Sequence, residues 1–432
     1  MKSNSSSHSG SNIGKATAWS FAAEVAAKIV VPITNMVLAR ILAPSAFGII
    51  ATLNVVISFA EVFSIAGFQR YIVQHNFRSE GELNESATVA FWANLFIATL
   101  MWVVITVFRF PIVIAVGSAG YETPLIIAAL ILPINALSAV QETLFQRNLE
   151  YKILFIRRVT TSFLPFIVTV PLALLGFTYW ALIIGTIVGG IVKVIILTIS
   201  SEWKPALFFS FALLKSMFSF GLWTLLESFS MWASSYIDIL IISNKMGDYF
   251  TGLYKTSQST VTGLLSIITG ATTSVLFVSL SRFQDDKNRF EEIFYRFQKS
   301  ISIFVLPIGV GIFCFRITIT EILLGHQWLE AAEFVGIWGL CTSFVCAFGT
   351  FCREVYRAKG KPNLSVIVQL LHLAFVIPVC IIYVRKGFDV FIYARSFAHL
   401  QIILLHFLFV KFKFDLSPKK MFLEVKEPLV CS

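Results

Sequence analysis

The chain has 432 residues, of which 57% are hydrophobic and only 13% are charged, with 43 phenylalanines among them. Soluble domains carry about 25% charged residues, so this composition excludes an ordinary soluble protein and indicates an integral membrane protein. The net charge of +10 does not indicate a partner made of nucleic acid, because the basic residues gather in short loops on one side of the predicted membrane region.

The chain begins with a polar, serine-rich stretch, MKSNSSSHSGSN, which predicts a disordered start. A signal peptide is not expected, because the apolar run that follows is too long and lacks a small-residue cleavage site. That run, Gly14 to Leu38, has 25 residues and would rise roughly 37 Å as a helix. It is therefore long enough to cross a hydrocarbon core of about 30 Å.

This first predicted helix has an acidic and a basic residue near its middle, where each charge facing lipid costs about 2.5–3.5 kcal/mol. Helical spacing places five polar residues in one stripe: Thr17, Ser20, Glu24, Lys28 and Asn35. Two interpretations stay open. The acid and the base, four residues apart, form a pair that only lowers the insertion cost, or the stripe lines a cavity.

Further apolar runs separated by polar breaks predict an all-α membrane protein with about twelve transmembrane helices. The approximate limits of these helices are 14–38, 47–68, 86–108, 122–141, 156–176, 179–200, 216–242, 252–278, 300–323, 332–352, 364–384 and 390–410.

The basic residues assign the two sides of the membrane. With the N-terminus inside, the inner segments hold 24 Lys and Arg residues and the outer loops hold 5. The positive-inside rule therefore predicts that both termini are cytoplasmic. The outer loops are short, which leaves no place for catalytic machinery outside the bilayer and argues against an enzyme.

The longest inner loop, Ser279 to Lys299, has charges of both signs and aromatic residues at helical spacing. It predicts an amphipathic helix on the inner membrane surface. Asp285 and Asp286 lie beside Lys287, which indicates a solvated loop and not a metal site. The cysteines are not clustered, so neither a metal site nor a structural disulfide is expected, and no cofactor is predicted.

An internal repeat relates the first helix to the seventh. An offset of 203 residues aligns Glu24 with Glu227 and Asn35 with Asp238. With Ser234, the two acids of the seventh helix form one polar face. Two six-helix lobes related by a pseudo-two-fold axis along the membrane normal are therefore predicted, facing each other across a cavity. The predicted parts are a disordered cytoplasmic N-terminus at 1–13, an N-lobe at 14–200, a connection at 201–215, a C-lobe at 216–410 and a cytoplasmic tail at 411–432.

The eighth predicted helix also has a polar face, which includes Lys255 and Gln258. This face either lines the cavity or holds helices together, and Lys255 can also snorkel to the interface. Snorkelling is the expected use of the other isolated charges in the spans, namely Glu61, Lys193, Arg316 and Arg395. Histidines 372, 399 and 406 are expected to make hydrogen bonds between helices.

Several stretches, taken together in order and spacing, carry a resemblance to a known family. They include LARILAPSAFGIIATLNVVISFAEVFSIAGFQRYIVQ (38–74), LFQRNLEYKILFIRR (144–158), YWALIIG (179–185), KSMFSFGLWTL from 215, NKMGDYFTGLYK, VLFVSLSRFQDD, ILLGHQWLEAAEFVGIWGL and YRAKGKPNLS. The chain resembles the polysaccharide flippases of the multidrug/oligosaccharidyl-lipid/polysaccharide exporter superfamily. Many members of that family have two further C-terminal helices. This sequence is therefore expected to be either a natural twelve-helix member or a shortened one.

The resemblance implies a flippase of the bacterial inner membrane, working by alternating access. Its cargo would be an undecaprenyl-pyrophosphate-linked oligosaccharide for exopolysaccharide or O-antigen (lipopolysaccharide) biosynthesis, moved from the inner to the outer leaflet. The implied cavity is polar and partly cationic. Its predicted residues are Glu24, Lys28, Asn35, Glu227, Ser234, Asp238, Lys255 and Gln258.

No nucleotide-binding motif is present, so coupling to a proton or sodium ion is expected, with Glu24 or Asp238 as the ion site. Membrane lipids surround the protein, and a polysaccharide polymerase and chain-length machinery are further expected partners. The alternative function is an ion-coupled exporter of drugs or other small cargo, which favours an acidic, aromatic cavity. A membrane polymerase or glycosyltransferase is a third alternative, and the short outer loops argue against it.

Overall fold

The structure is a computed structural model that describes residues 30–64 and 68–430, and this part of the chain contains helices and turns but no β-strand. Nine helices in these ranges are long and apolar enough to cross a membrane, or ten if one bent pair is a single span. A shorter apolar helix covers Val30–Ile41. The all-helical membrane fold predicted from the sequence is therefore confirmed.

The chain divides into two compact units. The first contains the residues up to Leu42 together with Ile49–Trp232, and the second contains Ala43–Gly48 together with Ala233–Ser432. The boundary thus falls later than the predicted connection at 201–215. It also assigns the first residues of one N-terminal helix to the second unit.

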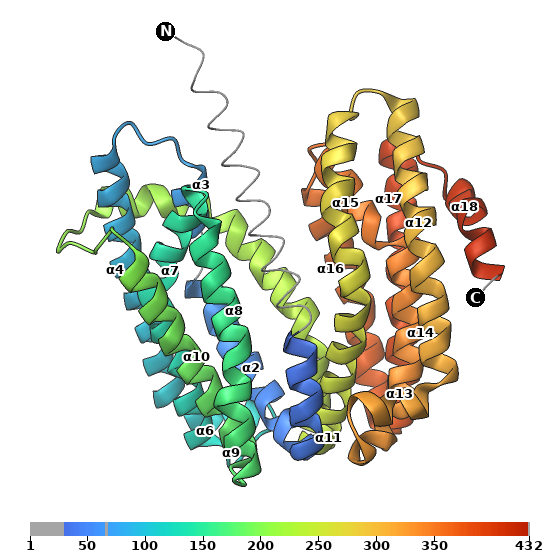
Figure 1. Cartoon of the computed structure of the whole chain (residues 1–432), viewed down its shortest axis with the longest axis horizontal. Coiled ribbons are helices and arrows are strands. Elements are labelled where there is room, and N and C mark those ends of the chain that lie inside the picture. The colour runs from blue at the N-terminus through green and yellow to red at the C-terminus, as the bar shows by residue number, and fades with distance from the viewer. Residues whose placement is uncertain (1–29, 65–67, 431–432) are drawn as a thin grey trace. The chain divides into compact units, whose positions relative to one another are not determined.

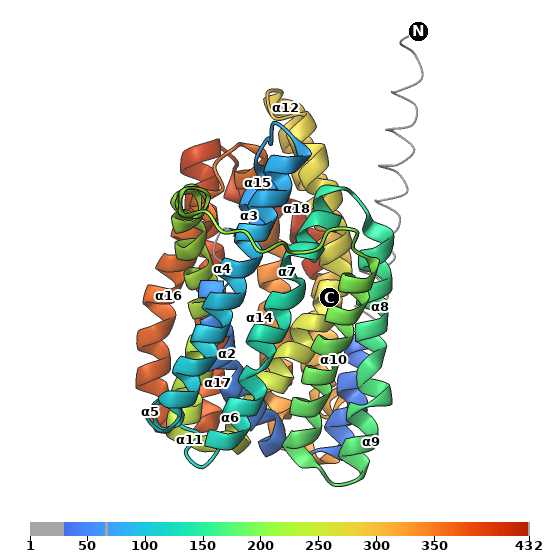
Figure 2. The ribbon, with the colours of Figure 1, turned by 90° about the vertical axis from the view of Figure 1, so that its left-hand side faces the viewer.

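In the first unit, α4, α7 and α10 pack side by side and α8 packs on α10 (Figure 2). Ser79 begins α4 by accepting a hydrogen bond from the Glu82 backbone N–H, which satisfies a donor of the first turn. The helices that form this unit are α2 (Pro44–Ser64), α3 (Phe68–Gln74), α4 (Glu80–Val107), α5 (Arg109–Ala115), α6 (Glu122–Ala129), α7 (Ile131–Arg147), α8 (Tyr151–Ile167), α9 (Thr169–Leu174), α10 (Thr178–Ser200) and the first part of α11 (Phe211–Arg282).

In the second unit, α14 packs against both α12 and α17, and α16 packs against α17 (Figure 1). Trp328, Phe334 and Phe351 are fully buried in this part of the core. The helices of this unit after α11 are α12 (Lys287–Cys314), α13 (Arg316–Leu323), η1 (His326–Ala331), α14 (Ala332–Phe348), α15 (Thr350–Ala358), α16 (Asn363–Tyr383), η2 (Val384–Lys386), α17 (Phe388–Phe414) and α18 (Pro418–Val430).

Helix α11 contains 72 residues. A straight helix of that length would measure roughly 108 Å, several times the thickness of a membrane. Within it, Gly247 has non-helical angles, with φ at 81°, and it lies between the predicted seventh and eighth spans. Glycine adopts a positive φ at no steric cost, so it is the residue that allows the helix to change direction there.

The inner segment at 279–299 differs from the prediction. Helix α12 begins at Lys287, where Asp286 accepts a hydrogen bond from the Arg289 backbone N–H, and it continues without a break into the span. Phe290 and Phe294 are buried, and α12 packs against α18 (Figure 1). The aromatic residues therefore pack within the protein, and this segment is not a separate surface helix.

The end of α17 is fixed to the start of α12 by an exposed ion pair. Lys287 donates to Asp415, which has left-handed backbone angles at the C-cap of α17. This lysine holds the pKa of the Asp415 carboxyl below its usual range. Because the pair is exposed to solvent, its contribution to stability is small.

Candidate functional site

The second unit contains a polar cavity of about 610 Å³. Residues from α11, α14, α15, α16 and α17 line it. The lining includes three basic residues, Lys255, Arg353 and Arg395, and no acidic residue. A cavity of this size and lining suits a hydrated, negatively charged group.

A buried ion pair lies at the edge of this cavity. Arg395 Nη2 on α17 is 3.3 Å from Asp238 Oδ2 on α11, and their side chains are 6% and 1% exposed. The Tyr254 hydroxyl donates to the same carboxylate oxygen at 2.6 Å, and the Ile239 backbone N–H donates to Oδ1 at 2.9 Å. Gln258 in turn donates to the Tyr254 hydroxyl at 3.3 Å. The carboxylate of Asp238 is thus already neutralised and hydrogen-bonded.

The same arginine keeps two donors that are not used. Arg395 Nε and Nη1 are buried and have no hydrogen-bond partner in the described part of the chain. The guanidinium carbon lies 5.2 Å from the ring centre of Trp338, which is within the range of a cation–π interaction. Asp238 therefore holds one end of the guanidinium while other N–H groups remain able to bind a ligand.

Three histidines line the cavity, and two of them have partners. His372 Nδ1 is 2.9 Å from Gln401 Oε1, and His406 Nδ1 is 3.0 Å from the Tyr356 hydroxyl. These contacts join α16 to α17 and α15 to α17, so the prediction of interhelical hydrogen bonds is confirmed for both. His399 instead stacks on Trp338, with ring centres 4.7 Å apart.

The predicted site residues fall into two groups. Glu24, Lys28 and the side chain of Glu227 lie outside the described residues. Asn35 is exposed on the helix Val30–Ile41, and its part in a cavity stays a prediction. In the second unit, Ser234, Lys255 and Gln258 line the cavity, while Asp238 is buried next to it.

The residues that sequence reasoning missed include Arg353, Arg395, His399 and Trp338. Arg395 and His399 are four residues apart on α17, which places them on one helix face. That spacing was a usable signal. The partner of Arg395 was not visible from the sequence, because Asp238 lies 157 positions away.

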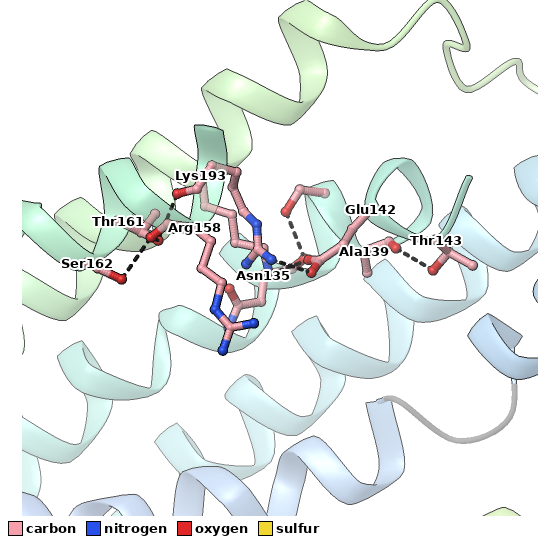
Figure 3. A network of polar contacts seen from close by, with 10 residues as sticks. Asn135, Ala139, Glu142, Thr143, Arg158, Thr161, Ser162 and Lys193 are labelled. Carbon is pink, nitrogen blue, oxygen red and sulfur yellow. Dashed lines mark hydrogen bonds and ion pairs between the residues drawn. The ribbon is translucent and has the colours of Figure 1, made fainter. Parts of the chain in front are cut away.

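The first unit has its own polar network, shown in Figure 3. Glu142 on α7 accepts from Arg157 on α8 and from Lys193 on α10, both at 3.1 Å. Asn135 hydrogen-bonds Glu61 on α2, and Lys193 also acts electrostatically on that acid. Lys193 and Glu61 are therefore members of an internal network and do not simply snorkel. The two acids, Glu61 and Glu142, and the two basic residues, Arg157 and Lys193, have charges that balance.

A sequence profile of the family described as "Polysaccharide biosynthesis protein" matches residues 37–333. Among curated proteins, the chain is 26% identical over 324 residues to the succinoglycan biosynthesis transport protein ExoT of Rhizobium meliloti. That match covers 74% of this chain and 64% of ExoT, so it spans less than two thirds of that relative. The chain is also 22% identical to the lipopolysaccharide biosynthesis protein WzxC of Escherichia coli, covering 80% of this chain and 70% of WzxC.

Solved structures share the fold. The lipid II flippase MurJ in an inward closed conformation superposes with a TM-score of 0.75 at 16% identity, covering 96% of this chain and 91% of MurJ. An inward-facing transporter of the multidrug resistance MATE family gives a TM-score of 0.67 at 15% identity, covering 94% of this chain and 96% of that chain. At such low identity the likeness concerns the fold alone.

Proposed function

The chain belongs to the polysaccharide biosynthesis protein family, and from this we propose that it is a flippase for a lipid-linked oligosaccharide in a bacterial inner membrane. The cargo would be an undecaprenyl-pyrophosphate-linked glycan that passes from the inner to the outer leaflet. Movement of this kind makes and breaks no covalent bond, so the protein would act as a transporter and not as an enzyme. The named relatives ExoT and WzxC serve succinoglycan and lipopolysaccharide biosynthesis, which supports a role in exopolysaccharide or O-antigen assembly.

The observation that carries this proposal is the cavity of the second unit. Three basic residues and no acid line this cavity. In the first-unit network, by contrast, the acids Glu61 and Glu142 balance the charges of Arg157 and Lys193. The head of the cargo combines an anionic pyrophosphate with hydrated sugars. A cationic cavity with many hydroxyl and amide side chains matches both parts, because cations stabilise the phosphates and polar side chains replace water on the sugars.

The second candidate is an exporter of drugs or other small cargo, which the shared fold with a MATE transporter favours. Cationic drugs would need an acidic cavity. The described cavity has Arg395, Lys255 and Arg353 on its wall, and Asp238 behind it is paired. This charge pattern supports an anionic cargo over a cationic one.

The orientation and energy source are also part of the proposal. Both termini would be cytoplasmic, as the distribution of basic residues predicts. Of the two predicted ion-coupling carboxylates we retain Glu24, because Asp238 is neutralised by Arg395. A proton or sodium ion remains the proposed coupling ion, and a polymerase with its chain-length machinery remains the proposed downstream partner.

Leaflet-resolved labelling of the lipid-linked glycan tests this function. Cells that lack the protein should accumulate the glycan in the inner leaflet, and the wild-type chain should restore its outward movement. Lys255→Gln should restore several-fold less, because the cavity loses one of its cations. Lys386→Gln, which changes an exposed lysine of the same unit, is the matched control. Glycan that is outward-facing but not extended in the deleted cells would refute the proposal.

A further inference from the structure

Trp338 brings together two cavity residues that have unused hydrogen-bonding atoms. The guanidinium of Arg395 lies 5.2 Å from its ring centre, and the imidazole of His399 stacks on it at 4.7 Å. Trp338 is itself oriented by a hydrogen bond to Thr262, at 3.4 Å. Arg395 and His399 are one helical turn apart on α17, so both face the cavity from one side of that helix.

Arg395 is 5% exposed and has two N–H groups, on Nε and Nη1, without partners in the described part of the chain. Buried donors without partners are costly, and the cost is larger for charged groups. A ligand with several acceptor oxygens would remove that cost. Charge-assisted bonds from arginine to phosphate-like oxygens are among the stronger hydrogen bonds in proteins.

The charges around this point favour an anion. Lys255 on α11 and Arg353 on α15 also line the cavity, and Asp238 is the acid in contact with Arg395. His372 on α16 and His406 on α17 face the cavity as well, and Cys346 lines it from α14. No described lining residue is acidic. One acid therefore faces three basic side chains.

His399 differs from the other two histidines, because its Nδ1 has no hydrogen-bond partner in the described residues. In a neutral imidazole one ring nitrogen is an acceptor, and both become donors after protonation. A proton on His399 would add a positive charge one turn from Arg395. An anion next to it would stabilise that proton, and by linkage the proton would strengthen the binding of the anion equally.

We propose that the cavity of the second unit is an oxoanion site in which Arg395 supplies the permanent charge and His399 takes up a proton together with the anion. This proposal rests on the proposed flippase function, where the oxoanion would be the phosphate group of the lipid carrier. Proton uptake would then occur at a histidine of the second unit, in addition to the binding of the coupling ion proposed at Glu24.

Sulfate is a suitable probe, because it remains a dianion across pH 5.5–8.5 and any pH dependence belongs to the protein. Binding to the purified full chain would be measured by calorimetry in two buffers of different ionisation enthalpy. The expected result is an affinity that rises roughly three- to tenfold per pH unit as the pH falls, with uptake of about one proton per sulfate. His399→Gln should still bind sulfate but should lose the pH dependence. His326→Gln, at a side chain that is 84% exposed, is the matched control.

The anion site itself is tested by removing the guanidinium. Asp238→Asn combined with Arg395→Gln replaces the ion pair by a neutral pair and should weaken sulfate binding at least tenfold. Arg395→Lys retains the charge and the contact with Asp238, and should weaken it less. Wild-type affinity in the double variant would overturn the assignment of Arg395. Sulfate binding that is independent of pH, or a pH dependence that persists in His399→Gln, would overturn the role of His399. Each of these failures leaves the leaflet-labelling result unaffected, so it is distinct from a failure of the flippase function.

Discussion

At the scale of single residues, the molecule places charges inside a membrane and compensates them in two ways. Arg395 and Asp238 form one isolated pair with small exposure, whereas Glu142 joins two cations from two other helices. Burial of ions is costly in either case, so an uncompensated partner is strongly destabilising. The two arrangements therefore predict different responses to mutation.

Neutralising Asp238 alone should destabilise the protein. Asp238→Asn leaves the Arg395 charge buried without a counter-ion, and we expect a loss of about 3–5 kcal/mol in the free energy of unfolding. Adding Arg395→Gln should recover most of that loss, because no buried charge remains. Thermal unfolding of the detergent-purified chain measures both variants. A double variant as unstable as the single one would contradict the pairing.

Neutralising Glu142 should have a smaller effect. Glu142→Gln removes the partner of Arg157 and Lys193, but the side chains are about 20% exposed and water screens part of the cost. We expect a loss of about 1–3 kcal/mol, between the values for exposed and fully buried pairs. Glu80→Gln, an exposed change in the first turn of α4, should change stability by less than about 0.5 kcal/mol. Equal stabilities for the two variants would show that the network contributes nothing.

Site residues could be predicted from the sequence only where polar residues recur at helical spacing along one helix. Ser234, Lys255 and Gln258 belong to polar helix faces in the sequence and line the cavity of the second unit, while their part in binding a substrate stays a prediction. The four-residue spacing of Arg395 and His399 on α17 did not identify the site by itself, because a charge near a helix end can also snorkel and the partner of Arg395 is on another helix. His399 was assigned the same structural use as His372 and His406, because the stacking partner of an imidazole depends on tertiary packing.

At the scale of helices, α2 and α11 approach each other closely within the second unit. An added Cβ on Gly48 would lie 1.7 Å from the Asp248 carbonyl oxygen, and one on Gly252 would lie 1.8 Å from the Pro44 carbonyl oxygen. Both obstacles are backbone atoms, which cannot move as a side chain does. The contact thus requires glycine on both helices.

Alanine at these glycines should separate the two helices. Gly48→Ala or Gly252→Ala is expected to lower the free energy of unfolding by about 1–3 kcal/mol or more through overpacking. Gly311→Ala on α12 is the control, because its added Cβ would meet no atom within 4 Å. It should stabilise the helix by up to about 1 kcal/mol. Thermal unfolding of the three variants checks this, and a harmless Gly48→Ala would refute the close approach.

Helices were the most predictable elements, because a bilayer requires long apolar runs and the loops that break them are polar. The segment before α12 shows the limit of this reasoning. Its amphipathic pattern is equally suited to a membrane surface and to a neighbouring helix, and the packing of α12 on α18 decided between them. Phe290 and Phe294 are buried, and Lys359 lies over the Phe290 ring.

At the scale of the whole molecule, the proposed topology can be tested with cysteine labels. His326 lies in an exposed segment expected outside, and Asp285 is exposed in a segment expected inside. A membrane-impermeant maleimide should label His326→Cys in intact spheroplasts and Asp285→Cys only after permeabilisation. Both variants also need Cys314→Ser, because Cys314 is exposed, and Cys431→Ser, because the sequence has a further cysteine at 431. The reverse pattern would invert the predicted orientation.

The pairing of Asp238 with Arg395 also has a consequence for how such sequences diverge. The two positions are 157 residues apart, yet each charge depends on the other. A lineage that lost only one of them would pass through a protein with an unpaired buried ion. Aligned relatives should therefore keep both charges or lose both, so that positions 238 and 395 vary together while the residues between them vary independently.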